Sequence, residues 1–235
     1  MTSSEILQQL EALGQDSIKK VLLKHDIREP LFGVKVEELK KIQKKIKNGY
    51  SLSLELYKTG VYDAMYLAGL IAEPLKMSKA EIEEWAETSN SPALCGNMVA
   101  WVAAESRYGL DLALDWVKSN SEPIATAGWA TLASIVALKD DKDLDIALIK
   151  ELVLQVENNI TTSQNKVKSA MNNFIISVGI YVKDLNTFAK EAALRIGKVK
   201  IDMGDTACKV PYAIEYIEKA ETRGTIGKKK KEARC

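Results

Sequence analysis

Residues 163–180 read SQNKVKSAMNNFIISVGI, which predicts a long helix with a basic first turn, small residues in its middle and an apolar second half. Two amide side chains, Asn172 and Asn173, stand next to each other in this stretch. An unpaired buried amide costs about 1–3 kcal/mol. The two amides are therefore either paired with neighbouring helices or exposed in a groove that binds something polar.

Three other stretches are equally rich in small residues and nearly free of charge, at residues 64–72, 93–104 and 124–137. They recur at intervals of roughly 30–45 residues, and each follows a charged amphipathic segment. This alternation is typical of HEAT-like repeats, in which each helical hairpin buries its apolar face only against its neighbours. Strand patterns are nearly absent. The sequence therefore predicts an all-α fold, a curved solenoid of HEAT-like antiparallel helical hairpins (an α-α superhelix). The charged helices are expected at 52–58, 79–88, 109–118, 142–158 and 184–196.

The predicted solenoid forms one HEAT-like-repeat domain over residues 1–222. Its last helix is expected at 211–222, because proline is favoured at the first position of a helix. Residues 197–210 contain two glycines and are predicted to form a loop or a short extended piece. Residues 223–235 carry a run of lysines and no apolar face, which indicates a basic, mobile C-terminal tail.

The net charge of the 235 residues is +1, but the charge is unevenly distributed. Residues 1–50 carry 10 basic and 7 acidic groups, residues 51–165 carry 8 and 17, and residues 166–235 carry 15 and 8. A basic C-terminal third after an acidic middle indicates either a face that binds a polyanion or a solvated lysine-rich surface.

The three cysteines, Cys95, Cys208 and Cys235, lack paired spacing, which favours a reducing cytoplasm. Cys95 lies in a small-residue helix and is expected to be a buried structural thiol. The N-terminus lacks the pattern of a signal peptide, and no apolar run reaches the ~20 residues of a membrane span.

Motifs for catalysis, metals or nucleotides are missing from the sequence. It has one histidine, His25, and neither of the glycine-rich nucleotide-binding fingerprints, so we expect no metal and no cofactor. Asp202 and Asp205 are the acids least explained by surface or helix-capping roles, although a turn role is the default for both.

Contacts to nucleic acid would come from the basic C-terminal third, where lysines and amides can bind phosphates. The chain has only five arginines, which favours recognition of backbone charge and shape over base readout. The candidate DNA-binding residues are Lys166, Lys168, Asn172, Asn173, Lys198, Lys200 and Lys209.

Three segments resemble the bacterial DNA alkylation repair family of HEAT-like-repeat proteins, whose founding members are alkylpurine DNA glycosylases. They are Val34–Ile42 (VKVEELKKI), Ala170–Gly179 (AMNNFIISVG) and Asp202–Lys209 (DMGDTACK). The resemblance covers nearly the whole chain, and the last two segments are its most specific part. It implies an all-α solenoid whose concave, basic face holds duplex DNA, in the cytoplasm of a bacterium and associated with the nucleoid.

Active members of the family use a catalytic aspartate, cleft tryptophans and an arginine. By resemblance, one cleft tryptophan falls at Ala93, the aspartate at Asn97, the arginine at Thr126 and a second tryptophan at Asn173. An amide presents only a dipole to a cationic sugar intermediate, whereas a carboxylate presents a full opposite charge.

Two tryptophans of the chain itself are candidates for lining the cleft, although core packing is the favoured interpretation for each. Trp101 lies four residues after Asn97, and Trp129 lies on the next small-residue helix.

The leading hypothesis is a DNA-binding member of this family that holds double-stranded DNA, alkylated or otherwise damaged, by backbone contacts on a concave basic face. It lacks the catalytic aspartate and cleft tryptophans of the glycosylases. One alternative is an active glycosylase that hydrolyses the N-glycosidic bond of N3- or N7-alkylated purines. A second alternative is a protein-interaction scaffold, since solenoids often bind proteins.

Overall fold

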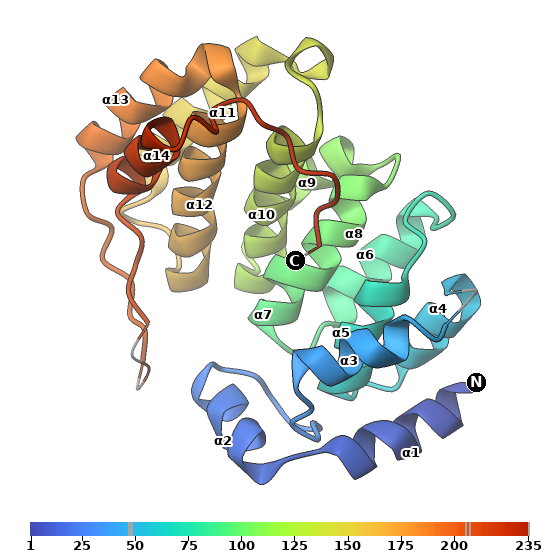
Figure 1. The fold of residues 1–235 in the computed structure, drawn as a ribbon. Helices are drawn as coiled ribbons and strands as arrows, with labels where there is room; N and C mark the ends of the chain where they lie inside the picture. The colour runs from blue at the N-terminus through green and yellow to red at the C-terminus, as the bar shows by residue number, and fades with distance from the viewer. Residues whose placement is uncertain (47–48, 205, 207, 235) are drawn as a thin grey trace.

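The computed structural model describes residues 1–46, 49–204, 206 and 208–234. Asp205 and Cys235, named above, lie outside these described residues. Within them the chain forms helices and loops without any strand, as predicted. Three short helices, α1 (Ser3–Leu13), α2 (Asp16–Lys24) and α3 (Val36–Gln43), cover the N-terminal end of the molecule (Figure 1).

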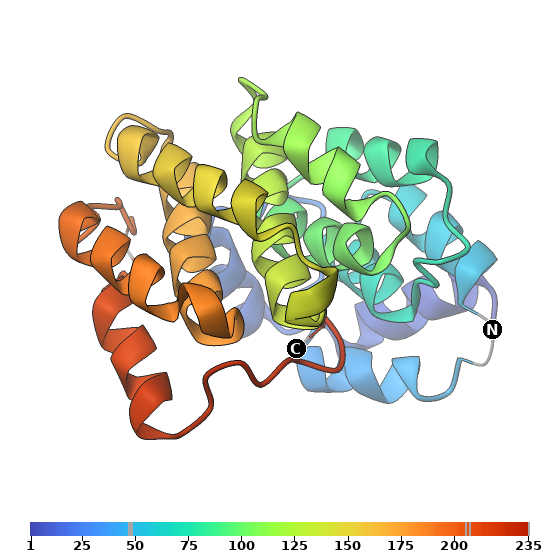
Figure 2. The same ribbon diagram turned by 90° about the horizontal axis from the view of Figure 1, so that it is seen from above.

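Antiparallel helical hairpins follow and form a curved right-to-left row in Figure 1. In each hairpin the first helix is outer, and the second belongs to an inner row that lies beside the inner helix of the next hairpin (Figure 2). The hairpins are α4 (Tyr50–Lys58) with α5 (Tyr62–Ile71); α6 (Lys79–Thr88) with α7 (Pro92–Leu94), the π-helix η1 (Cys95–Val99) and α8 (Ala100–Glu105); α9 (Gly109–Trp116) with α10 (Glu122–Leu138); α11 (Ile146–Asn159) with α12 (Asn165–Tyr181); and α13 (Asn186–Ile196) with α14 (Ala213–Thr222).

The predicted alternation of charged and small-residue helices is therefore confirmed. Local signals explain where the helices begin: Ser78 and Glu81 form the capping box that starts α6. The last helix begins at Ala213 rather than at Pro211, because Tyr212 is in an extended conformation and acts as its N-cap. The described residues between α13 and α14, which are 197–204, 206 and 208–212, form a loop that is called the loop 197–212 below.

Small residues let the inner helices approach their neighbours closely. At Gly128 of α10, an added Cβ would lie 2.7 Å from the backbone nitrogen of Val117. At Gly179 of α12, it would lie 2.5 Å from the Ile217 side chain of α14. A larger residue at either glycine would push the neighbouring segment away, because the interior is closely packed.

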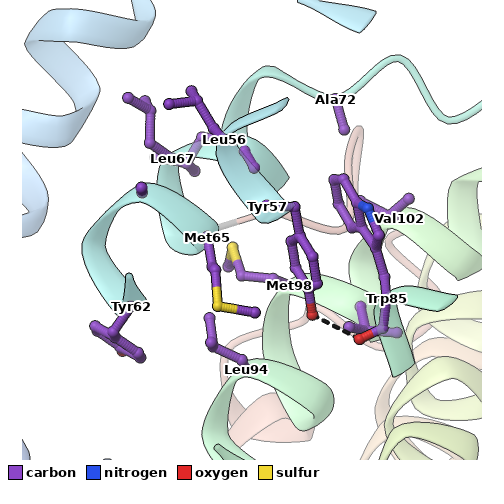
Figure 3. Close-up of a cluster of buried hydrophobic side chains, with 14 of the residues drawn as sticks. Leu56, Tyr57, Tyr62, Met65, Leu67, Ala72, Trp85, Leu94, Met98 and Val102 are labelled. Carbon is purple, nitrogen blue, oxygen red and sulfur yellow. Dashed lines mark hydrogen bonds between the residues drawn. The ribbon is translucent and has the colours of Figure 1, made fainter. Parts of the chain in front are cut away.

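The core runs through the solenoid as buried aliphatic residues with a few aromatic pairs. Tyr57 stacks on Trp85 with ring centroids 4.1 Å apart, and its hydroxyl donates a 2.6 Å hydrogen bond to the Trp85 carbonyl (Figure 3). Cys95 is fully buried beside this pair, and burial raises the pKa of its thiol to about 11. Cys95 is therefore a protonated core residue, as predicted.

A buried carboxylate joins the N-terminal helices to the first hairpin. Asp63, in the first turn of α5, is 0% exposed and accepts hydrogen bonds from the backbone N–H groups of Phe32 (2.6 Å), Gly33 (3.3 Å) and Val34 (2.8 Å). The loop can wrap around it because Gly33 has a φ of +79°, a conformation that other residues rarely adopt. The N-terminal end of α5 adds favourable electrostatics.

Candidate nucleic-acid interface

The inner helices border a groove with a cavity of about 410 Å³. It is lined by α7, η1 and α8 on one side, by α10 in the middle and by α12 on the other side. Half of its lining residues are alanine, glycine or serine, so a ligand can approach the helices closely. None of the residues that line it is acidic.

The four positions derived from the family resemblance converge on this groove. Ala93, Asn97, Thr126 and Asn173 come from three different inner helices, and all four line the same cavity. Asn97 and Asn173 are exposed, whereas Thr126 is 7% exposed and its hydroxyl has no hydrogen-bond partner among the described residues. The groove thus presents two exposed amides, from η1 and α12.

Asn97 lies on the π-helix η1, which interrupts the inner helix between α7 and α8. π-Helical turns are rare and occur mostly at functional sites. An added Cβ at Gly96 would lie 3.1 Å from the Thr126 side chain, so the glycine lets η1 pack closely on α10. The sequence signal for this feature is a glycine followed by an amide within an otherwise apolar helix.

The two neighbouring amides of α12 differ in their surroundings. Asn172 is buried, and its Nδ2 donates a 2.9 Å hydrogen bond to the Pro211 carbonyl, which connects α12 to the segment before α14. Asn172 therefore does not face the groove, and its assignment as a DNA contact is corrected to a structural role. Asn173 is exposed and lines the groove.

The two tryptophan candidates also lie in different surroundings. Trp101 lines the groove and meets the Tyr66 ring edge-on, with centroids 6.4 Å apart. Trp129 is 0% exposed and packs against Phe174, with centroids 5.4 Å apart. Trp129 is therefore a core residue, the role favoured for it from the sequence, and its candidacy for the cleft is corrected because its position on α10 points into the core.

The predicted lysines do not form one cluster. Lys166 lines the groove at the start of α12, where its backbone N–H donates to Glu122 (2.8 Å), and Lys168 is partly exposed on the same helix. Lys198 and Lys209 line a separate hollow at the base of the loop 197–212, with Lys198 Nζ 5.5 Å from the Tyr212 ring. Lys200 is exposed on this loop.

The loop 197–212 projects past the start of α12 (Figure 1). It is fixed there by Asn165, whose side chain donates to the Asp202 carbonyl (2.6 Å) and accepts from the Asp202 N–H (2.8 Å). Asp202, one of the unexplained acids, also accepts from the N–H of Gly204 (2.8 Å), which is a turn role.

Residues 225–234, which we call the strap, differ from the predicted mobile tail. The strap leaves α14 and crosses the ends of the inner helices (Figure 1 and Figure 2). The N–H of Gly227 donates to the Ile180 carbonyl (2.8 Å), and the N–H of Lys230 donates to the Ala137 carbonyl (2.8 Å). The backbone of the strap is therefore hydrogen-bonded to both α12 and α10.

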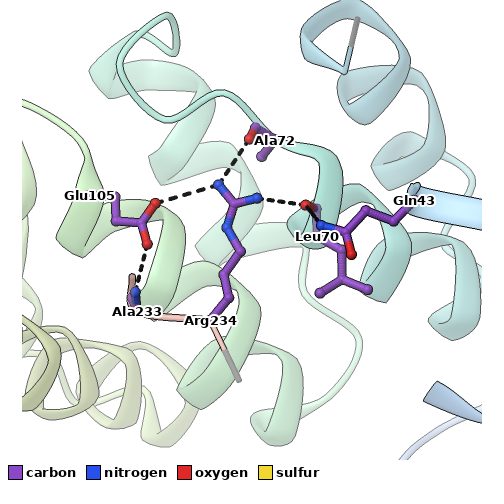
Figure 4. A network of polar contacts seen from close by, with 6 residues as sticks. All are labelled: Gln43, Leu70, Ala72, Glu105, Ala233 and Arg234. Carbon is purple, nitrogen blue, oxygen red and sulfur yellow. Dashed lines mark hydrogen bonds and ion pairs between the residues drawn. The ribbon is translucent and has the colours of Figure 1, made fainter. Parts of the chain in front are cut away.

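Two cationic side chains complete the docking of the strap. Lys229 Nζ donates to the Val136 carbonyl (2.9 Å) and pairs with Asp141 (2.7 Å). Arg234 donates to the carbonyls of Leu70 (2.6 Å) and Ala72 (3.1 Å) and pairs with Glu105 at 3.4 Å (Figure 4). The last carbonyls of a helix lack partners within the helix and carry negative partial charge, which explains why a basic segment binds there.

The described residues contain no cluster of three or more histidine, cysteine, aspartate or glutamate side chains that could hold a metal ion. In the same part of the chain, no helix combines the length and apolar character needed to cross a membrane.

Comparisons with known proteins agree with this geometry. The family model described as "DNA alkylation repair enzyme" matches residues 6–217. Two similar chains are the "Uncharacterized protein Lmo0209" of Listeria monocytogenes and the "Uncharacterized protein Lin0241" of Listeria innocua. Each is 30% identical over 230 residues, which is 95% of this chain and 99% of the relative.

One solved structure superimposes with a TM-score of 0.91 at 35% sequence identity and covers 100% of both chains. It is described as "A new family of proteins related to the HEAT-like repeat DNA glycosylases with affinity for branched DNA structures". The predicted HEAT-like solenoid and the resemblance noted in the sequence are thereby confirmed. The chain belongs to the DNA alkylation repair enzyme family.

Proposed function

We propose that this protein binds DNA in the groove between its inner helices, prefers branched DNA, and has no glycosylase activity. The observation that carries the proposal is the composition of the groove. Its lining holds exposed Asn97 and Asn173 and partly exposed Lys166 but no carboxylate, in a chain with 32 acidic residues. Phosphate backbones are bound by lysines and amides, and a nearby carboxylate would repel them.

The solved relative supports branched DNA as the preferred form, because its description names affinity for branched DNA structures. A curved solenoid has an extended surface, and branched DNA offers phosphates from more than one helical arm to such a surface. The acid-free groove also favours a polyanion over a protein partner, so the scaffold hypothesis has no comparable observation in its support.

The test is a binding titration with a labelled four-way junction and a duplex of the same sequence. The wild type is expected to bind the junction more tightly, and affinity should fall steeply with salt. The double variant Lys166→Glu, Asn173→Asp adds negative charge inside the groove and is expected to lower affinity at least tenfold (about 1.4 kcal/mol).

The matched control is Lys118→Glu, Lys150→Glu, which changes a similar number of charges on the outer side of the solenoid, away from the groove. Its affinity should stay within about threefold of the wild type, because exposed charges beyond a Debye length are largely screened. Equal losses in the two variants would mean that the groove is not the binding site.

Glycosylase activity is expected to be absent. Asn97 cannot supply the charge of the family's aspartate, and Ala93 and Asn173 replace its tryptophans. DNA carrying N7-methylguanine should release no base above the spontaneous rate when incubated with the protein. Asn97→Asp should also be inactive, because catalytic groups that act as a unit are not restored singly. Base release proportional to protein concentration would favour the alternative of an active glycosylase.

A further inference from the structure

The strap separates its basic side chains into two sets. Lys229 and Arg234 point onto the protein, with side chains only 13% and 17% exposed. Lys228, Lys230 and Lys231 are exposed, and of these Lys230 lies 5.8 Å from the Tyr181 ring. The side chains that anchor the strap are therefore not the ones that are exposed. The three exposed lysines, which we call the outward lysines, belong to a backbone that is hydrogen-bonded to α10 and α12.

Lys229 and Arg234, which anchor the strap, also change the charge at the edge of the molecule where the strap crosses the ends of the inner helices. The inner helices α5, α10 and α12 present C-terminal carbonyls here, together with the carboxylates of Glu105 and Asp141. Bare helix ends and carboxylates would repel a polyanion. The strap covers these groups with its backbone and two of its cations, and it leaves three cations on the outside. With its five basic residues and the one acid, exposed Glu232, the strap adds net positive charge to this edge.

Lys230, one of the outward lysines, lies at the opposite end of the groove from Lys166, and Lys228 and Lys231 are its neighbours on the strap. Lys166 is at the start of α12 and Lys230 contacts Tyr181 at its end, and both side chains line the same cavity. Fifteen residues of α-helix separate these ends by about 22 Å, which is comparable with the width of a DNA duplex. Lysines 228 to 231 span roughly 10 Å of extended chain, the length of about three phosphates along one strand.

We propose that the strap is a phosphate-binding edge of the DNA groove, in which Lys228, Lys230 and Lys231 contact one DNA backbone while the Lys166 side of the groove contacts the other. This inference rests on the proposed DNA binding and adds to it a specific element with a specific ligand. The strap is then a fixed part of the interface and not a tail that orders on binding.

The test compares the salt dependence of junction binding in two triple variants of the full chain. Lys228→Gln, Lys230→Gln, Lys231→Gln removes the outward charges and keeps Lys229 and Arg234. The slope of log affinity against log salt should become shallower by about 3, because each lost phosphate contact changes it by about 0.9. Affinity at low salt should fall at least tenfold.

The matched control is a triple variant on the outer side of the solenoid, with Lys79 of α6, Lys118 in the turn after α9 and Lys150 of α11 each changed to Gln. It removes the same charge from residues that do not line the groove, and its slope should equal that of the wild type. Circular dichroism and urea titration should give both triple variants wild-type stability, because none of the six lysines anchors the strap.

Two outcomes would overturn the inference and can be told apart. If the strap variant keeps the wild-type slope while Lys166→Glu, Asn173→Asp still weakens binding, the strap has only a structural role and the groove remains the DNA site. If the wild type binds neither junction nor duplex at low salt, the proposed function itself is overturned together with the role of the strap.

Discussion

Replacing Asp63 with alanine is expected to lower the free energy of unfolding by about 3–4 kcal/mol. Three backbone N–H groups in the loop before α3 donate to this fully buried carboxylate. Hydrogen bonds to a charged group contribute about 1.5–3 kcal/mol, and each buried donor left without a partner adds a penalty. The loss should appear in urea unfolding as a lower midpoint with a nearly unchanged m-value.

Asp63→Asn should have an intermediate effect, because one oxygen still accepts while the new NH₂ group faces a backbone donor. The matched control is Glu55→Ala, which removes an exposed acid from the outer helix α4 and should change stability by less than about 0.5 kcal/mol. If Asp63→Ala were as stable as the control, the carboxylate would not be what attaches the N-terminal helices to the first hairpin.

Replacing Arg234 with methionine is expected to lower the free energy of unfolding by about 2 kcal/mol and to release the end of the strap. The guanidinium group joins the C-terminal end of α5 to Glu105 of α8, so it bridges two hairpins (Figure 4). Methionine keeps most of the apolar stem but loses every donor. Hydrogen exchange of residues 228–234 should become faster, because their attachment at this end is lost.

Arg223→Met is the matched control, since Arg223 is exposed after the end of α14 and lies before the strap begins. It should leave both stability and exchange in the strap unchanged. Leu70 keeps a hydrogen bond from Gln43 (2.8 Å) in the Arg234 variant, which limits the loss to a few kcal/mol. Unchanged exchange in the Arg234 variant would mean that the Lys229 side chain and the backbone contacts at Gly227, Lys230 and Ala233 hold the strap without Arg234.

The solenoid was predictable from the sequence because its signals are local. The capping box at Ser78, the stop at Gly14 and the composition of residues 124–137 each depend on neighbours within a few positions. The alternation of charged and small-residue helices then permits few architectures other than stacked hairpins. The four positions taken from the family resemblance line one cavity, and their role in binding stays a prediction.

The amino-acid sequence by itself determined the helices, their alternation and the absence of a carboxylate at the positions that line the groove. Only the tertiary structure decided between residues of the same type. Asn172 faces Pro211 whereas Asn173 faces the groove, because adjacent residues on a helix point in directions about 100° apart. Trp129 lies in the core and Trp101 lines the groove. Packing sets the rotation of each helix about its axis, and this rotation decides which side chains face the groove.

The ordered conformation of the strap was the feature that depended most on the tertiary structure. Its sequence is a lysine run without an apolar face, and nothing near it in the chain offers a partner. Its partners are carbonyls at helix ends far away, such as Val136, 93 positions before Lys229, and Leu70, 164 positions before Arg234. Those carbonyls lie along one edge only after the hairpins have stacked in parallel. The order of this basic segment is therefore a property of the assembled solenoid.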